Sequence, residues 1–268
     1  MEEIGGVAAG TQTDLLRRLF FERLHAPNDD SLDRALVGLV MDHARRVIAH
    51  PSRPVVVTHD TFLRYPQGEL ALEETIEESP LLSSPEDFLV ERHLQKPFSC
   101  VAMLDCSSSM SGEKHLLASI AVAVLLLEVV SRDTSVTVFA SDALTIKKLH
   151  AEEPPEKTIL KFLKTNPKGF TNIHRGLGEG LSQYKRMGAA KRRVGLIATD
   201  GRTTEGGDPL ETARQFDFLV VLHLHGPGSH IEASKEMAQA GRGICLEVEK
   251  FEQLPRRLYD ALRMLARM

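Results

Sequence analysis

From Pro97 to the end of the chain, short apolar runs alternate with segments of helical periodicity. A continuous apolar run, without alternating polar residues, is typical of a parallel strand that is buried on both faces. Parallel strands need crossover connections, and the helical segments between the runs supply them. We therefore predict a doubly wound α/β domain whose mostly parallel sheet is flanked by helices.

The predicted elements of this domain follow one another in a simple order. They are a strand at 98–104, a helix at 114–131, a hairpin of strands at 135–139 and 143–149, a helix at 156–164, a helix ending near 187, strands at 193–198 and 218–224, a helix at 231–240, a strand at 244–248 and a last helix from about 255.

Residues 1–95 differ in character from the rest of the chain. Apolar residues recur at helical spacing over 15–24 and again over 32–47. A short strand is expected at 55–57, an acidic helix at 70–78 and a turn or linker at 80–85. Two amphipathic helices alone bury little surface. We therefore expect 1–95 to be a mainly helical extension that packs on the main domain, residues 96–268.

Oxygen-bearing side chains follow the first predicted strand. Asp105, Ser107 and Ser109 come directly after the apolar run 98–104, and open α/β sheets bind ligands at this carboxyl edge. One carboxylate and two hydroxyls suit a small divalent cation such as Mg²⁺. The alternative is a turn whose side chains cap the next helix, as Ser and Asp often do.

Two later residues favour the metal site over the helix cap. Thr171 lies in a loop that opens a helical pattern, and Asp200 directly follows the apolar run 194–198 and Thr199. The ends of neighbouring parallel strands meet at one edge of a sheet. We therefore expect five residues to converge on one metal: Asp105, Ser107, Ser109, Thr171 and Asp200.

On these residues the chain resembles the von Willebrand factor A (VWA) family, with its Rossmann-like fold and its metal-ion-dependent adhesion site, over roughly 96–268. The resemblance implies that Ser107, Ser109 and Thr171 are direct ligands of Mg²⁺, with Mn²⁺ or Ca²⁺ as alternatives. It also implies that the two aspartates act largely through water. Phe170 is a departure, because a second glycine is common before the threonine in that family.

A second, shorter resemblance lies in the segment 69–76, Glu-Leu-Ala-Leu-Glu-Glu-Thr-Ile. It is similar to an element that precedes the metal loop in CoxE-like bacterial VWA proteins and in relatives of the magnesium-chelatase D subunit. This resemblance implies a partner of the MoxR-type AAA+ ATPase class and a role in client activation or metal-centre assembly.

The donor set favours binding over catalysis. Hydroxyl ligands are neutral, so the metal keeps charge that attracts an Asp or Glu carboxylate from another protein. We therefore expect a non-enzymatic adaptor. One alternative is a hydrolase that attacks a phosphoester with a metal-activated water at the same site. Another is an RNA-associated VWA module that binds through Lys191, Arg192 and Arg193.

The composition of the chain bears on its class of partner and on its cellular compartment. A formal net charge of -4 argues against a nucleic-acid partner, and three cysteines, an odd number that forms no disulfide framework, fit a reducing compartment. The first residues lack the basic start and apolar core of a secretory signal. The most apolar segment, 116–130, is interrupted and is shorter than the ~20 residues of a membrane span. We expect a cytoplasmic protein with no membrane contact.

Two further features carry less weight. His223 and His225 share one face of a strand, which is a spacing that zinc can use, but the sequence offers no third ligand nearby. Cys106 lies within the predicted metal loop, where the neighbouring Asp105 would raise the pKa of its thiol. We expect neither a zinc site nor a cysteine nucleophile.

Overall fold

The structure is a computed structural model that describes residues 8–25, 29–48, 56–64, 69–78, 81, 84–94, 99–128, 133–186, 192–249, 253, 254, 257, 260 and 264. Its contacts divide the chain into two compact units. The larger unit comprises residues 1–51 and 98–265, and the smaller comprises residues 52–97 and 266–268. The N-terminal helices thus belong to the larger unit, and the following segment forms a unit of its own.

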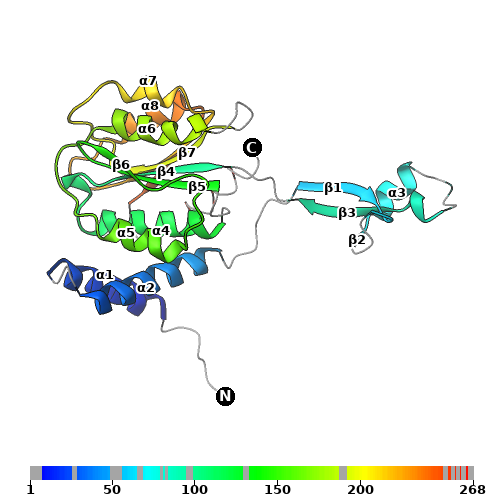
Figure 1. Cartoon of the computed structure of the whole chain (residues 1–268), viewed down its shortest axis with the longest axis horizontal. Helices are drawn as coiled ribbons and strands as arrows, with labels where there is room; N and C mark the ends of the chain where they lie inside the picture. The colour runs from blue at the N-terminus through cyan, green and yellow to red at the C-terminus, as the bar shows by residue number, and fades with distance from the viewer. Residues whose placement is uncertain are drawn as a thin grey trace, which may run out of the picture. The chain divides into compact units, whose positions relative to one another are not determined.

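The larger unit is built on a sheet with the strand order β6-β5-β4-β7-β8-β9 (Figure 1). Every neighbouring pair is parallel except β5 and β6, which form the expected antiparallel hairpin. The strands are β4 (Cys100–Asp105), β5 (Thr134–Phe139), β6 (Ala143–Lys147), β7 (Val194–Thr199), β8 (Phe218–Leu224) and β9 (Ile244–Val248). The prediction of a doubly wound, mostly parallel sheet is confirmed.

Helices cover both faces of this sheet. On one face lie α4 (Glu113–Glu128) and α5 (Pro155–Leu163); on the other lie α6 (Ile173–Ser182), α7 (Pro209–Ala213) and α8 (Ile231–Ala240) (Figure 1). Strands β4, β5 and β7 are buried along their whole length. Burial on both faces explains why their sequences are continuous apolar runs rather than alternating ones.

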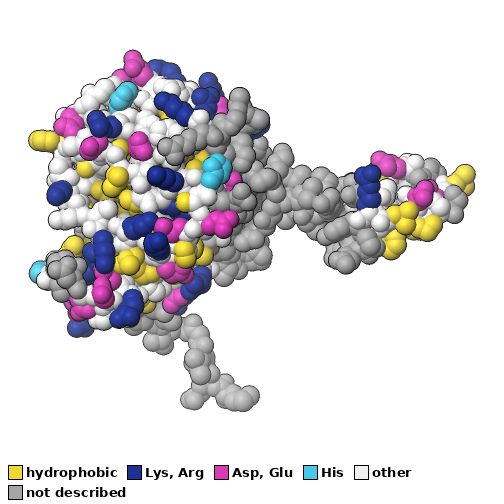
Figure 2. Space-filling model, viewed as in Figure 1, with side chains coloured by type: hydrophobic (Ala, Val, Ile, Leu, Met, Phe, Trp, Pro, Cys, Tyr) yellow, Lys and Arg dark blue, Asp and Glu magenta, His cyan; other side chains and the backbone are white. Residues whose placement is uncertain are grey.

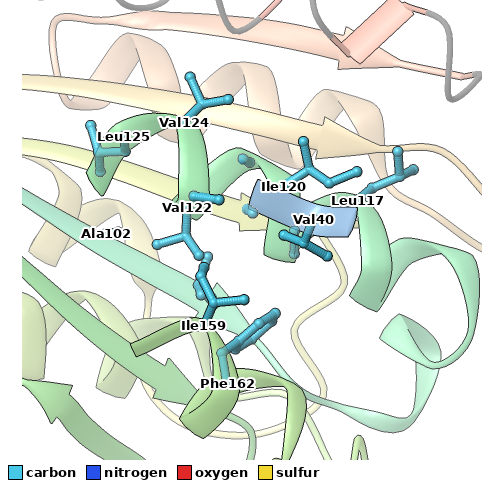
Figure 3. Packing of buried hydrophobic residues seen from close by; sticks show 14 of the residues in the cluster. Val40, Ala102, Leu117, Ile120, Val122, Val124, Leu125, Ile159 and Phe162 are labelled. Atoms are coloured by element: carbon cyan, nitrogen blue, oxygen red, sulfur yellow. The ribbon is translucent and has the colours of Figure 1, made fainter. Parts of the chain in front are cut away.

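The N-terminal helices form a further layer against α4. Helix α1 (Ala8–His25) packs on α2 (Asp30–Ile48), and α2 packs on α4 and α5. Figure 3 shows Val40 of α2 beside Leu117 and Ile120 of α4. Because α4 is enclosed between the sheet on one side and these helices on the other, it is apolar around most of its circumference.

The smaller unit contains an antiparallel sheet of order β1-β3-β2, made of β1 (Val56–Thr61), β2 (Glu69–Leu70) and β3 (Leu89–Leu94). Helix α3 (Leu72–Glu78) and the 3-10 turn η1 (Pro85–Asp87) complete it. Thr75 joins the helix to the sheet, since its hydroxyl accepts a hydrogen bond of 2.9 Å from the Leu89 amide. The sequence predicts β1 and α3 but neither β2 nor β3.

Other differences from the predicted elements are small. Helix α4 ends at Glu128 within the described residues, and the short helix α7 is an addition. The helix predicted from about 255 lies largely outside the described residues. Leu254, which is described, is buried. Within the described part of the chain, no helix combines the length and the apolar character needed to cross a membrane.

His115 of α4 provides a test of this packing. Its side chain is 1% exposed, and its ring stacks on Phe162 of α5 with a centroid distance of 4.3 Å. Burial lowers the pKa of His115 from 6.5 to about 4. Between these values the unfolded chain binds the proton and the folded chain does not, so stability falls as pH decreases.

We predict that His115→Leu weakens the acid dependence of stability. Wild-type protein loses roughly 2 kcal/mol through this residue between pH 7 and pH 5, and the variant avoids that loss. Urea unfolding at the two pH values measures the difference. The control is His25→Leu, at an exposed position of α1. Equal pH dependence in wild type and His115→Leu would contradict the prediction.

Candidate metal centre

The predicted metal ligands lie at the carboxyl edge of the central strands. β4 and β7 are adjacent and parallel, with Leu104 paired to Ala198. The helix that follows β4 covers one face of the sheet, and helix α6, which precedes β7, covers the other (Figure 1). Such a change of face makes this edge a topological switch point, where open α/β sheets place their ligand sites.

Asp105 ends β4 and is fully buried. Its Oδ1 accepts a hydrogen bond from the Ser107 amide at 2.9 Å, and its Oδ2 accepts one from the Thr199 hydroxyl at 2.7 Å. Burial raises the pKa of this carboxyl from 3.8 to about 6, in spite of these hydrogen bonds. The carboxylate is therefore fixed in position but poorly solvated, and a nearby cation would stabilise its charged form.

The two serines follow in a tight turn. Residues Ser108–Met110 form the 3-10 turn η2, with Ser107 at its N-cap. The hydroxyls of Ser107 and Ser109 lie 3.3 Å apart. Ser107 is buried, whereas Ser109 is partly exposed. The turn thus brings together the two hydroxyls that the sequence places two residues apart.

The loop that carries Thr171 is tied to the serine turn through main-chain groups. The Gly169 carbonyl accepts hydrogen bonds from the Ser108 amide at 3.3 Å and the Ser108 hydroxyl at 3.0 Å. Gly169 has a φ of 85°, which favours glycine. The Lys168 amide also donates to the Cys106 carbonyl at 2.9 Å. These bonds place the second loop directly against the first.

Thr171 is buried, and its main chain is held by the segment that follows Asp200. Its amide donates to the Thr204 hydroxyl at 2.8 Å, and its carbonyl accepts from the Thr204 amide at 2.9 Å. The preceding Phe170 has 64% of its surface exposed. The larger side chain at the position where the family often has glycine therefore faces solvent while Thr171 stays anchored.

Asp200 follows β7 and is fully buried. Its Oδ2 accepts from the Lys114 Nζ at 2.9 Å, and its Oδ1 accepts from the Arg202 amide at 3.2 Å. The next residue, Gly201, has a φ of 75°, and a Cβ there would collide with the carbonyl of His230. Glycine is therefore required for the sharp turn that follows Asp200.

Two residues at this edge were missed by sequence reasoning. Thr199 bridges two of the loops, since its hydroxyl donates to Asp105 and accepts from the Gly201 amide at 3.2 Å. Its place at the end of β7, one residue beyond the Leu104–Ala198 pair, is the signal that identifies it. Lys114 carries no such signal, because a lysine in the first turn of a helix is normally solvated.

The donor set suits a hard divalent cation. Three hydroxyls and two carboxylates are oxygen donors, which Mg²⁺, Mn²⁺ and Ca²⁺ prefer. Among the described residues, no cluster of three or more His, Cys, Asp or Glu side chains is placed to hold a metal ion. A metal at this edge would therefore depend on the hydroxyls of Ser107, Ser109 and Thr171 as well as on the aspartates.

One ring nitrogen of each candidate histidine is engaged elsewhere, and the candidate cysteine is protonated. His223 Nδ1 lies 2.8 Å from the Ser234 hydroxyl, and His225 Nε2 lies 3.1 Å from the Glu247 carboxylate. Their partners therefore come from α8 and β9. Burial raises the pKa of the Cys106 thiol to about 12, so it is protonated at neutral pH and is a poor nucleophile.

Sequence comparison gives a match over a short segment of the chain. No family model matches the chain. A segment of 61 residues is 36% identical to the uncharacterized protein YwmC of Bacillus subtilis (strain 168). That match covers 22% of this chain and 27% of YwmC, so it spans about a quarter of the relative's length.

Comparison with solved structures identifies the fold. BatB from Bacteroides thetaiotaomicron matches with a TM-score of 0.53 at 19% identity, over 64% of this chain and 100% of that one. Proximal thread matrix protein 1 of the mussel byssus, whose metal-ion-dependent adhesion motif is occupied by zinc, matches with a TM-score of 0.52 at 18% identity. This match covers 63% of this chain and 48% of that one. A von Willebrand factor type A protein from Catenulispora acidiphila matches with a TM-score of 0.50 at 13% identity, over 65% of this chain and 43% of that one. The chain has the VWA fold.

We predict that Thr199→Val weakens metal binding at this edge. The change keeps the shape of the side chain but removes the donor to Asp105, which leaves that carboxylate less well held. Loss of the buried hydrogen bond should cost about 1–3 kcal/mol of unfolding free energy. Isothermal titration with Mn²⁺ should show lower affinity than in wild type.

The matched control for this variant is Thr158→Val on α5. Thr158 is also buried and donates to a carboxylate, that of Glu153, at 2.9 Å. It should lose stability without losing Mn²⁺ affinity. If the two variants bind Mn²⁺ equally well, Thr199 has no part in positioning the site.

Proposed function

We propose that this chain is a non-enzymatic, divalent-metal-dependent protein-binding adaptor. Mg²⁺, or Mn²⁺ or Ca²⁺ in its place, would be held by the hydroxyls of Ser107, Ser109 and Thr171, and it would accept an Asp or Glu carboxylate from another protein. The observation that carries this proposal is the meeting of three loops at the switch point beside two buried aspartates.

The charge of the donor set supports carboxylate binding. Neutral hydroxyls do not offset the charge of a cation, so a divalent ion held by them remains a strong acceptor for an acidic ligand. A zinc-occupied motif in the mussel byssus protein, which shares the fold, lends support to a divalent ion at this edge.

The hydrogen bonds of the two aspartates favour binding over hydrolysis. A general base must be within hydrogen-bond reach of the water it activates. Asp105 already accepts from Thr199, and Asp200 is paired with Lys114. The engagement of both carboxylates and the protonated state of Cys106 support the proposed binding role over hydrolysis.

We further propose that the protein is cytoplasmic and works with a MoxR-type AAA+ ATPase in client activation or metal-centre assembly. Support comes from the segment 69–76, which carries the resemblance to the CoxE-like group. In the structure this segment includes β2 and most of α3. Apolar side chains lie on the surface of the smaller unit (Figure 2).

Helix α3 is the surface that we propose as the contact for that ATPase. Leu72 and Ile76 are each 59% exposed, while Thr75 between them is buried against the sheet. Glutamates at 73, 74, 77 and 78 surround the two apolar side chains. The matching surface on the ATPase would be an apolar groove with basic residues at its rim.

We predict that Asp105→Ala abolishes metal-dependent partner capture. The purified protein is immobilised and exposed to lysate of its own cells, with Mg²⁺ or with EDTA. Wild type should retain an acidic client only in Mg²⁺, and the variant should retain none, because the site has lost one of its two carboxylates. Circular dichroism should show that the variant remains folded.

The matched control for this experiment is Asp42→Ala, at a largely exposed position on α2. It should behave as wild type. Client capture that persists at full strength in folded Asp105→Ala, or that is unaffected by EDTA, would overturn the proposal.

We predict that Leu72→Gln combined with Ile76→Gln removes AAA+ ATPase capture while leaving Mn²⁺ affinity unchanged. Both side chains are exposed, so their replacement should change stability by no more than about 0.5 kcal/mol. Leu144→Gln is the control, since Leu144 is 65% exposed but lies on β6 of the larger unit. Undiminished ATPase capture by the double variant would rule out this helix as the contact.

A further inference from the structure

A buried ion pair forms part of the candidate metal centre. Lys114 lies in the first turn of α4, and its side chain is only 11% exposed. Its ammonium nitrogen is 2.9 Å from Oδ2 of Asp200, whose side chain is fully buried. A positive charge of the protein itself is therefore already present where a divalent cation is expected.

The lysine is held in this position from the other side. Gly226 follows β8, and a Cβ at this residue would lie 2.8 Å from the Lys114 nitrogen. The backbone of Gly226 therefore packs directly against the end of the lysine side chain. With Asp200 on one side and Gly226 on the other, the ammonium is fixed rather than free to move into solvent.

This arrangement changes the charge balance of the site. Two aspartates would offset the whole charge of a divalent cation, but Lys114 already offsets that of Asp200. A bound divalent ion would therefore leave an excess of one positive charge in a buried environment. An incoming carboxylate would restore neutrality, so the ion and an acidic ligand should favour each other's binding.

We propose that Lys114 is a specificity-determining residue that couples metal binding to carboxylate binding. It keeps the affinity for the metal alone low, and it makes occupancy depend on an acidic ligand. This inference rests on the proposed function, because it assumes that the edge binds a divalent ion. It assigns the coupling to a residue that lies outside the five predicted metal residues.

The test compares Mn²⁺ affinity in wild type, Lys114→Met and Lys114→Gln by isothermal titration, with chloride or with acetate as the anion. Methionine keeps the length of the side chain without its charge, and glutamine also keeps a hydrogen-bond donor for Asp200. Both variants should bind Mn²⁺ in chloride at least tenfold more tightly, which is about 1.4 kcal/mol. Acetate should tighten Mn²⁺ binding in wild type but not in either variant.

Two controls separate charge from other effects. Lys114→Arg keeps the charge and should not bind Mn²⁺ more tightly than wild type. Lys161→Met removes a lysine of α5 from a different ion pair, with Glu153 at 2.7 Å. It should leave Mn²⁺ affinity unchanged.

The outcomes distinguish this inference from the function on which it rests. If wild type and both neutral variants fail to bind Mn²⁺, the metal centre itself is wrong, and the inference fails with it. If wild type binds Mn²⁺ and the neutral variants bind it equally or more weakly, only the role of Lys114 is overturned. Equal effects of acetate on wild type and the variants would also overturn it.

Discussion

The candidate site is organised around the burial of two carboxylates at one edge of an apolar sheet. Asp105 and Asp200 are both fully buried, and a charged group without compensation in such a place is strongly unfavourable. Each is compensated in a different way. Asp105 accepts hydrogen bonds from Ser107 and Thr199, whereas Asp200 is paired with Lys114. The groups that satisfy the two acids therefore tie together the end of β4, the end of β7 and the start of α4.

The rest of the larger unit keeps that edge in register. The parallel pairing of β4 with β7 brings the two aspartates to the same edge. Helix α4 carries Lys114 in its first turn and is enclosed between the sheet and the N-terminal helices. Figure 3 shows how closely its apolar side chains meet those of α2 and α5. The position of the lysine thus depends on packing that begins with the first helices of the chain.

The charged side chains on the surface of the larger unit are of mixed sign. In Figure 2, basic and acidic side chains are interspersed over the face in view, with neither sign forming a broad patch there. A nucleic-acid partner would call for a basic stripe on the face that it contacts.

The central strands could be predicted from the sequence because burial on both faces leaves a clear pattern. The apolar run of β4 and the oxygen-bearing residues after it can be recognised in the sequence without knowledge of the tertiary structure. Strand β3 was missed because Leu89–Leu94 contains Glu91, Arg92 and His93 between its apolar ends. The two-residue strand β2 is too short to leave a pattern of its own. That α1 and α2 pack on the main domain is expected because two amphipathic helices alone bury little surface, but the helix that they contact, α4, leaves no pattern in their sequence.

Lys114 shows why part of the site could not be predicted. The N-terminal end of a helix carries partial positive charge, so a lysine in the first turn is locally unfavourable. Such a lysine usually extends into water, and its sequence position says nothing about a buried partner. Here Asp200, 86 residues away in sequence, supplies the compensating charge. Local preferences that are violated and then compensated by distant groups are characteristic of functional sites. The residue least favoured by its own helix is therefore the one whose charge best explains the electrostatics of the site.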